Sequence, residues 1–139
     1  MKIGFTGTQI GTTTAQRAVL MQLLVAGTEF HHGDCVGADE NAHAIASSLG
    51  LRTVCHPPIN PAKRAFTEND ETREPKDYIA RNHDIVDETD FLLATPKFNA
   101  EELRSGTWAT IRYAKKSGKR VGIIFPDGSI NLWKPEQQA

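Results

Sequence analysis

Cysteine is scarce in this sequence of 139 residues, which contains only Cys35 and Cys55. The two thiols lack the paired spacing that zinc ligands usually show, and small secreted proteins that depend on disulfides carry more cysteines. A disulfide between the two is the less favoured alternative. The sequence therefore favours a reducing environment, and we expect a cytoplasmic protein.

Long apolar runs are also missing. No segment approaches the roughly 20 apolar residues of a membrane span, and Met1–Phe5 runs into the chain without the apolar core of a signal peptide. The formal net charge is −1, with both signs mixed along the chain. Because no basic field is present to hold a nucleic-acid backbone, we expect neither nucleic acid nor a membrane as the partner.

Familiar metal and catalytic motifs are absent as well. Gly4, Gly7 and Gly11 do not have the spacing of the dinucleotide fingerprint, and the first turn lacks the lysine of a P-loop. No serine lies in a nucleophile elbow. The histidines do not form the metal pattern of two histidines four apart flanking a glutamate. They are His31, His32, His43, His56 and His83. We therefore expect no metal and no resident cofactor.

Strand-like apolar runs alternate with helical spacing along the chain. We expect strands at 3–7, 28–32, 51–55, 91–94 and 121–125, a short edge strand at 130–133, and helices at 14–25, 41–49, 78–86 and 107–116. The polar segment 59–76 is expected to be a long loop or a partly ordered flap that closes over a ligand. This alternation predicts one α/β, Rossmann-like domain over residues 1–139, with a mainly parallel five- to six-stranded sheet and helices on both faces.

Three glycine-containing turns follow predicted strands, so all three fall at the carboxyl edge of the sheet, where α/β proteins bind ligands. Glycine lets a ligand approach the backbone, and the free N–H groups at a helix N-terminus attract phosphate. The alternative is that strand-to-helix connections need glycine for their own geometry. The turns are Thr6-Gly7-Thr8, Gly33-Asp34-Cys35-Val36-Gly37-Ala38-Asp39 and Ser105-Gly106-Thr107.

Several polar or aromatic side chains near these turns have two interpretations. Asp34 could accept a ribose hydroxyl or act as a base, or it could be a turn or N-cap aspartate. Asp39 fits best as an acid in the first turn of a helix. Arg81, next to Asn82, could reach a phosphate or lie on a solvated helix face. Trp108 could stack on a base, although a place in the core is favoured.

The order of these motifs resembles the SLOG superfamily of Rossmann-like nucleotide-binding domains, which includes the DNA-processing DprA domain and the LOG-type cytokinin phosphoribohydrolases. Among its members the chain is similar to small single-domain proteins described as YspA-like or lysine decarboxylase-like. The resemblance covers nearly the whole chain. Its motifs are Gly4-Phe5-Thr6-Gly7-Thr8, Gly33-Asp34-Cys35-Val36-Gly37-Ala38-Asp39, Arg81-Asn82, Ser105-Gly106-Thr107-Trp108 and Gly118-Lys119-Arg120-Val121.

The resemblance implies a nucleotide-type ligand at the carboxyl edge, with phosphate at Ser105–Thr107 assisted by Thr8 and Arg81, and ribose near Gly33, Asp34 and Asp39. It also makes a homodimer an option, because relatives commonly form one. The ligand-binding residues expected on these grounds are Thr6, Gly7, Thr8, Gly33, Asp34, Gly37, Ala38, Asp39, Arg81, Asn82, Ser105, Gly106, Thr107, Trp108 and Thr110.

The chain departs from the LOG-type enzymes at two positions. Ser105 replaces the second glycine of their glycine pair, and Thr110 stands where they carry a catalytic glutamate. We therefore expect a protein that binds a nucleotide or a nucleotide-derived small molecule. The alternative is a hydrolase that cleaves the N-glycosidic bond of nucleoside monophosphates, with Asp34 as the candidate catalytic residue and Glu101 as a substitute. A DprA-like DNA-binding role ranks third.

Overall fold

The strand β1 (Lys2–Gly7) lies at the centre of the sheet. The computed structural model describes residues 1–138, and Ala139, the last residue of the expected domain, lies outside them. β1 pairs in parallel on both sides, with Gly4 opposite His31 of one neighbour and Leu92 of the other. The strand order is β4-β3-β2-β1-β5-β6-β7. The remaining strands are β2 (Glu29–His32), β3 (Arg52–Cys55), β4 (Glu71–Thr72), β5 (Phe91–Thr95), β6 (Arg120–Ile124) and β7 (Ile130–Trp133).

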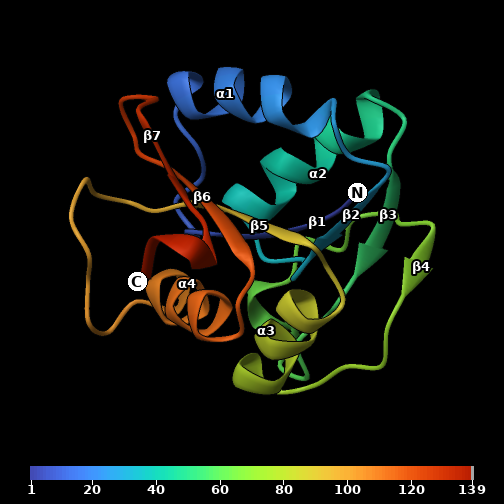
Figure 1. The fold of residues 1–139 in the computed structure, drawn as a ribbon. Helices are drawn as coiled ribbons and strands as arrows, with labels where there is room; N and C mark the ends of the chain where they lie inside the picture. The colour runs from blue at the N-terminus through green and yellow to red at the C-terminus, as the bar shows by residue number, and fades with distance from the viewer. Residues whose placement is uncertain (139) are drawn as a thin grey trace.

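Helices cover both faces of this sheet (Figure 1). On one face α1 (Thr14–Leu24) and α2 (Ala38–Ser48) enclose a core around Phe5 and Phe30. On the other, α3 (Tyr78–Asp87) and α4 (Gly106–Lys116) enclose a second core around Leu92. The short 3-10 helices are η1 (Pro61–Lys63) and η2 (Pro135–Gln138). No helix within residues 1–138 combines the length and the apolar character that crossing a membrane requires.

The expected α/β, Rossmann-like architecture is confirmed, with a mostly parallel sheet and helices on both faces. The predicted strand number is too low, because the sheet has seven strands. The additional strand, β4, forms inside segment 59–76 and pairs with β3, Val54 lying opposite Glu71. The edge strand predicted at 130–133 is β7, which runs antiparallel to β6.

α2 begins earlier than the sequence predicts, at Ala38 rather than at Asn41. Gly37 before it has a φ of 91°, and a Cβ at this position would lie 2.2 Å from the carbonyl oxygen of Gln9. The N–H of Ala38 donates to the carbonyl of Thr8 at 2.9 Å. This close approach fastens the loop after β1 to the start of α2.

Segment 59–76, expected to be a long loop or a partly ordered flap, contains the short elements η1 and β4. Side chains also fasten it to the sheet. Asp70 accepts the N–H of Thr53 at 2.8 Å, and the amide oxygen of Asn69 lies 2.8 Å from Nε2 of His32. Burial lowers the pKa of His32 to about 4, so the ring is neutral at pH 7. The segment is thus an anchored connection, and its closure over a ligand remains a prediction.

Asp34 provides a further anchor for this segment. Its carboxylate is 0% exposed and accepts hydrogen bonds from Nε of Arg64 at 2.8 Å and from the N–H and hydroxyl of Thr67 at 3.0 and 2.6 Å. Burial alone would raise the pKa of Asp34, but the hydrogen bonds from Thr67 and Arg64 hold it below its ordinary value of 3.8. The same hydrogen bonds hold the backbone of Asp34 at a φ of 57°, which non-glycine residues rarely adopt.

We expect Asp34→Ala to lower the free energy of unfolding by about 1–3 kcal/mol, because the donors of Thr67 and Arg64 lose the buried carboxylate that accepts from them. The lowered pKa means that the stabilisation is present at neutral pH and is lost as the pH falls below 3.8. Urea unfolding at pH 7 and at progressively lower pH measures both effects. Glu74→Ala, an exposed carboxylate in the same segment, is the control. A difference from wild type that stays constant down to pH 3 would contradict this role of the Asp34 charge.

Candidate functional site

A cleft of about 730 Å³ opens at the carboxyl ends of β1, β2 and β5. β2 follows β1 in the chain and lies on one side of it, whereas β5 lies on the other. The strand order therefore reverses between β1 and β5, and open α/β sheets bind their ligands at such a switch point. The walls come from the loop after β1, the turn after β2 with the start of α2, the segment around η1, α3 and the loop that leads into α4.

Residues from all three predicted turns meet in this cleft. The candidate residues that line it are Thr6, Gly7, Thr8, Gly33, Asp39, Arg81, Asn82, Ser105, Gly106 and Thr107. These residues belong to segments that are far apart in the sequence, and the parallel sheet brings them to one edge.

The other candidates do not line the cleft. Asp34 is engaged with Arg64 and Thr67, whereas Gly37 and Ala38 hold the loop after β1. Trp108 is buried in the core beneath α3 and α4, the place that the sequence favoured for it. Two further candidates are engaged elsewhere: the hydroxyl of Thr110 donates to the carbonyl of Gly106, and the carboxylate of Glu101 pairs with Arg112 at the surface. The observed roles of these side chains are packing and positioning.

Arg81 places a buried positive charge in the wall of the cleft. Its side chain is 5% exposed, and its hydrogen-bond partners are all uncharged. Nη1 donates to the carbonyls of Gly33 and His56, Nε donates to the amide oxygen of Asn82 at 2.7 Å, and Nη2 lies 3.8 Å from the sulfur of Cys35. No ion pair joins Arg81 to a carboxylate anywhere in residues 1–138. A buried charge without an ionic partner favours an anionic ligand.

Asp39 is the buried carboxylate of the cleft. It lies in the first turn of α2 and accepts the N–H groups of Gly33 and Cys35 at 3.0 and 3.1 Å. Burial raises the pKa of Asp39 to about 6, although the charge of Arg81 and the two backbone hydrogen bonds act in the opposite direction. The carboxylate thus holds the turn after β2 in the shape that receives Arg81.

The N-terminus of α4 forms another part of the lining. Ser105 caps the helix by accepting the N–H of Trp108 at 3.2 Å, which leaves the N–H groups of Gly106 and Thr107 without an acceptor in the described part of the chain. A Cβ at Gly106 would meet nothing within 4 Å, so this glycine faces open space. Free N–H groups at the positive end of a helix attract anions.

Several residues of the cleft were not found by the sequence analysis. Lys63, Lys97 and Arg104 add positive charge, Glu102 adds one carboxylate, and Tyr78 places a ring 5.3 Å below the guanidinium of Arg81. These side chains come from connecting segments and a helix start without a recognisable motif. The one available signal was Arg104, which directly precedes the Ser105-Gly106-Thr107 turn.

A second hollow, of about 630 Å³, lies between the end of α2, the start of β3 and residues 68–70. It lies at the start of β3 rather than at the carboxyl ends of the strands, and its lining contains no glycine turn that opens a helix. Its polar groups include Asp70, which is already bonded to Thr53. The cleft at the carboxyl edge is therefore the candidate ligand site.

No protein-family model and no curated protein sequence matches the chain. Several solved structures are similar to it. A molybdenum cofactor binding protein from the phototrophic bacterium Rippkaea orientalis superposes with a TM-score of 0.69 at 23% identity, over 89% of this chain and 76% of that one. The molybdenum cofactor carrier protein of Chlamydomonas reinhardtii gives 0.63 at 20%, over 88% and 74%. A structural-genomics target named TM1055 gives 0.64 at 17%, over 86% and 71%. These likenesses establish the Rossmann-like fold.

The packing around Arg81 predicts different effects of the same substitution at two glycines. In Gly33→Ala the new Cβ would lie 2.4 Å from Nη1 and 2.6 Å from Cζ of Arg81, so the guanidinium must leave its carbonyl partners. We expect a loss of about 1–3 kcal/mol in unfolding free energy. Gly106→Ala enters open space at the start of a helix and is expected to be neutral or slightly stabilising. Urea unfolding of both variants is the measurement, and equal stability of the two would refute the contact with Arg81.

Proposed function

We propose that the cleft binds a phosphate-bearing small molecule of the nucleotide type. The observation that carries this proposal is the buried guanidinium of Arg81, which has only uncharged partners in a cleft that also holds the free N–H groups of α4. A phosphate would supply the missing negative charge and accept hydrogen bonds from both. Lys63, Lys97 and Arg104, which also line the cleft, add to the attraction.

The proposed orientation follows from where donors and acceptors lie. The phosphate sits at Gly106 and Thr107, with Arg81 and Thr8 in support. The ribose and base extend toward Gly33 and the ring of Tyr78, which is partly exposed in the cleft and could stack on a base. Asp39 is held by two backbone N–H groups, so its role is to shape this end of the site.

The molybdenum cofactor is the second candidate ligand. Two of the structural neighbours are named as proteins that bind or carry it. The cofactor is a pterin that bears a phosphate, so it could use the same anion-binding groups as a nucleotide. A nucleotide and this cofactor are distinguished by the molybdenum content of the ligand that the protein carries.

We favour binding over hydrolysis. Thr110 stands where the resembled enzymes carry their glutamate, and its hydroxyl is engaged with the carbonyl of Gly106. Asp34 and Glu101, the substitutes considered from the sequence, have carboxylates engaged outside the cleft. If nucleoside monophosphates nevertheless release free base, Asp39 is the carboxylate to substitute first, because its pKa of about 6 suits proton transfer near neutral pH.

Four further expectations remain proposals. They are membership of the SLOG superfamily, a homodimer, a cytoplasmic location and one domain over residues 1–139. Sedimentation measures the oligomeric state and so tests the homodimer. DprA-like DNA binding ranks behind small-molecule binding because the chain has a formal net charge of −1.

Substituting Gly106 tests the anion site. We expect Gly106→Val to abolish binding of nucleoside monophosphates and cyclic nucleotides while the protein stays folded, because the side chain would occupy the approach to the free N–H groups of α4. Calorimetric titration gives the affinity, and circular dichroism verifies the fold.

Thr14→Val is the matched control, since Thr14 is the exposed first residue of α1 and does not line the cleft. It is expected to bind like wild type. If a nucleotide binds wild type and Gly106→Val with equal affinity, its phosphate does not bind at this turn. Failure of every nucleotide to bind wild type, together with molybdenum in the purified protein, would favour the second candidate ligand.

A further inference from the structure

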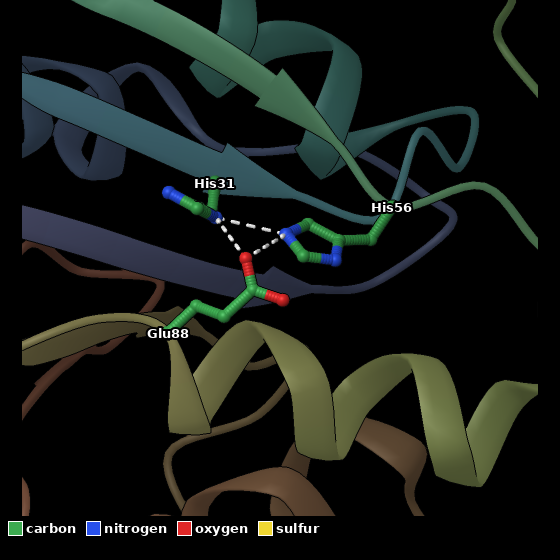
Figure 2. A group of neighbouring side chains, drawn as sticks. All are labelled: His31, His56 and Glu88. Atoms are coloured by element: carbon green, nitrogen blue, oxygen red, sulfur yellow. Dashed lines mark hydrogen bonds and ion pairs between the residues drawn. The ribbon is translucent and has the colours of Figure 1, made fainter. Parts of the chain in front are cut away.

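Away from the cleft lining, two buried imidazoles and a carboxylate converge between the sheet and α3 (Figure 2). His31 lies on β2, His56 follows β3, and Glu88 is the residue at which α3 ends. The histidines are 1% and 2% exposed, whereas the side chain of Glu88 is 34% exposed and opens the group to solvent. This group shares His56 with the Arg81 contact, because the backbone carbonyl of His56 accepts from Nη1.

The spacing of the three donor atoms suits one small ion. Nδ1 of His31 and Nε2 of His56 are 2.8 Å apart, and Oε1 of Glu88 lies 3.8 Å from the first and 3.9 Å from the second. Ligand atoms bound tetrahedrally at the usual zinc–nitrogen distance are about 3.3 Å apart. The carboxylate is too distant to hydrogen-bond either ring, so its hydrogen bonds are to Arg73, and its contact with the two rings is electrostatic.

The surroundings of His31 also match those of a metal ligand. Its other ring nitrogen, Nε2, lies 2.7 Å from a carboxylate oxygen of Glu29. A carboxylate on the second nitrogen fixes the tautomer that leaves the first nitrogen unprotonated, which is the arrangement usual for histidines bound to metals. Burial lowers the pKa of His31, and burial is also the main cause that lowers the pKa of His56 to about 3. Both rings are therefore neutral at pH 7, as metal binding requires.

Charge is balanced around the group as well. Glu29 and Glu88 offer two negative charges to a divalent ion. Arg73 donates to Oε1 of Glu88 from Nε and Nη2 at 3.1 and 2.7 Å. Because Arg73 also contacts Glu71, it retains a carboxylate partner when Glu88 turns toward an ion.

We propose that His31, His56 and Glu88 form a binding site for a divalent transition metal, with zinc the best match to two imidazoles and one carboxylate. Three protein ligands leave a fourth position for water or another ligand, on the side that Glu88 opens to solvent. The site ties β2, the end of β3 and the end of α3 together. It is independent of the nucleotide proposal, and it revises the expectation that the histidines bind no metal.

Titration of the chelator-treated protein with Zn²⁺ against a chromophoric chelator tests the site. We expect one ion per chain, and a visible Co²⁺ spectrum of the tetrahedral type when cobalt replaces zinc. Glu88→Gln should weaken binding at least 10-fold and His56→Gln should abolish it. Removal of the supporting carboxylate in Glu29→Gln should weaken binding by about 10–100-fold.

Glu101→Gln and His83→Gln make the same changes outside the group and should leave the zinc affinity unchanged. Because the side chain of Glu88 is partly exposed, we expect Glu88→Gln to fold, and its zinc affinity tests the site even if His56→Gln does not fold. Wild-type protein that does not bind one Zn²⁺ per chain, or Glu88→Gln with wild-type affinity, would overturn the proposal.

Discussion

The contact between the buried guanidinium of Arg81 and the carbonyl of Gly33 is the constraint on which the carboxyl edge of the sheet depends. Arg81 belongs to α3, Gly33 follows β2, and the second carbonyl partner, His56, follows β3. One side chain therefore determines how three segments meet. A side chain at Gly33 would displace this contact, since a Cβ would occupy the space of the guanidinium. Asp39 completes the arrangement by holding the N–H groups of the same turn.

This arrangement leaves the positive charge only partly compensated. Carbonyl and amide oxygens solvate a guanidinium, but they do not neutralise it, and a buried charge without an ionic partner is costly. Asp39 lies near enough for Arg81 to lower its pKa, yet burial still raises that pKa to about 6. The proposed anionic ligand would resolve the imbalance, because its charge could approach Arg81 and the free N–H groups of α4 together.

The sequence predicted the architecture well because strand and helix periodicity and glycine turns are local signals. It located the cleft for the same reason, since parallel strands bring their carboxyl ends to one edge. It could not decide what depends on tertiary contacts. From the sequence, Asp34 could be a ligand contact or a turn aspartate. Its side chain bonds Thr67 and Arg64, which belong to a segment whose ordered structure had no periodic signal. His31, His56 and Glu88 lie on three separate elements, so no spacing along the chain could reveal their convergence.

The most direct test of the central claim compares the small molecules released by denaturing purified wild-type protein and Arg81→Gln. Mass spectrometry should find a phosphate-bearing molecule, close to one per chain, in wild type and little or none in the variant. Arg64→Gln, whose guanidinium pairs with Asp34, controls for the loss of a partly buried arginine. A released ligand without an anionic group, or a phosphate-bearing ligand retained equally by Arg81→Gln, would contradict the assignment of Arg81 as the group that recognises the anion.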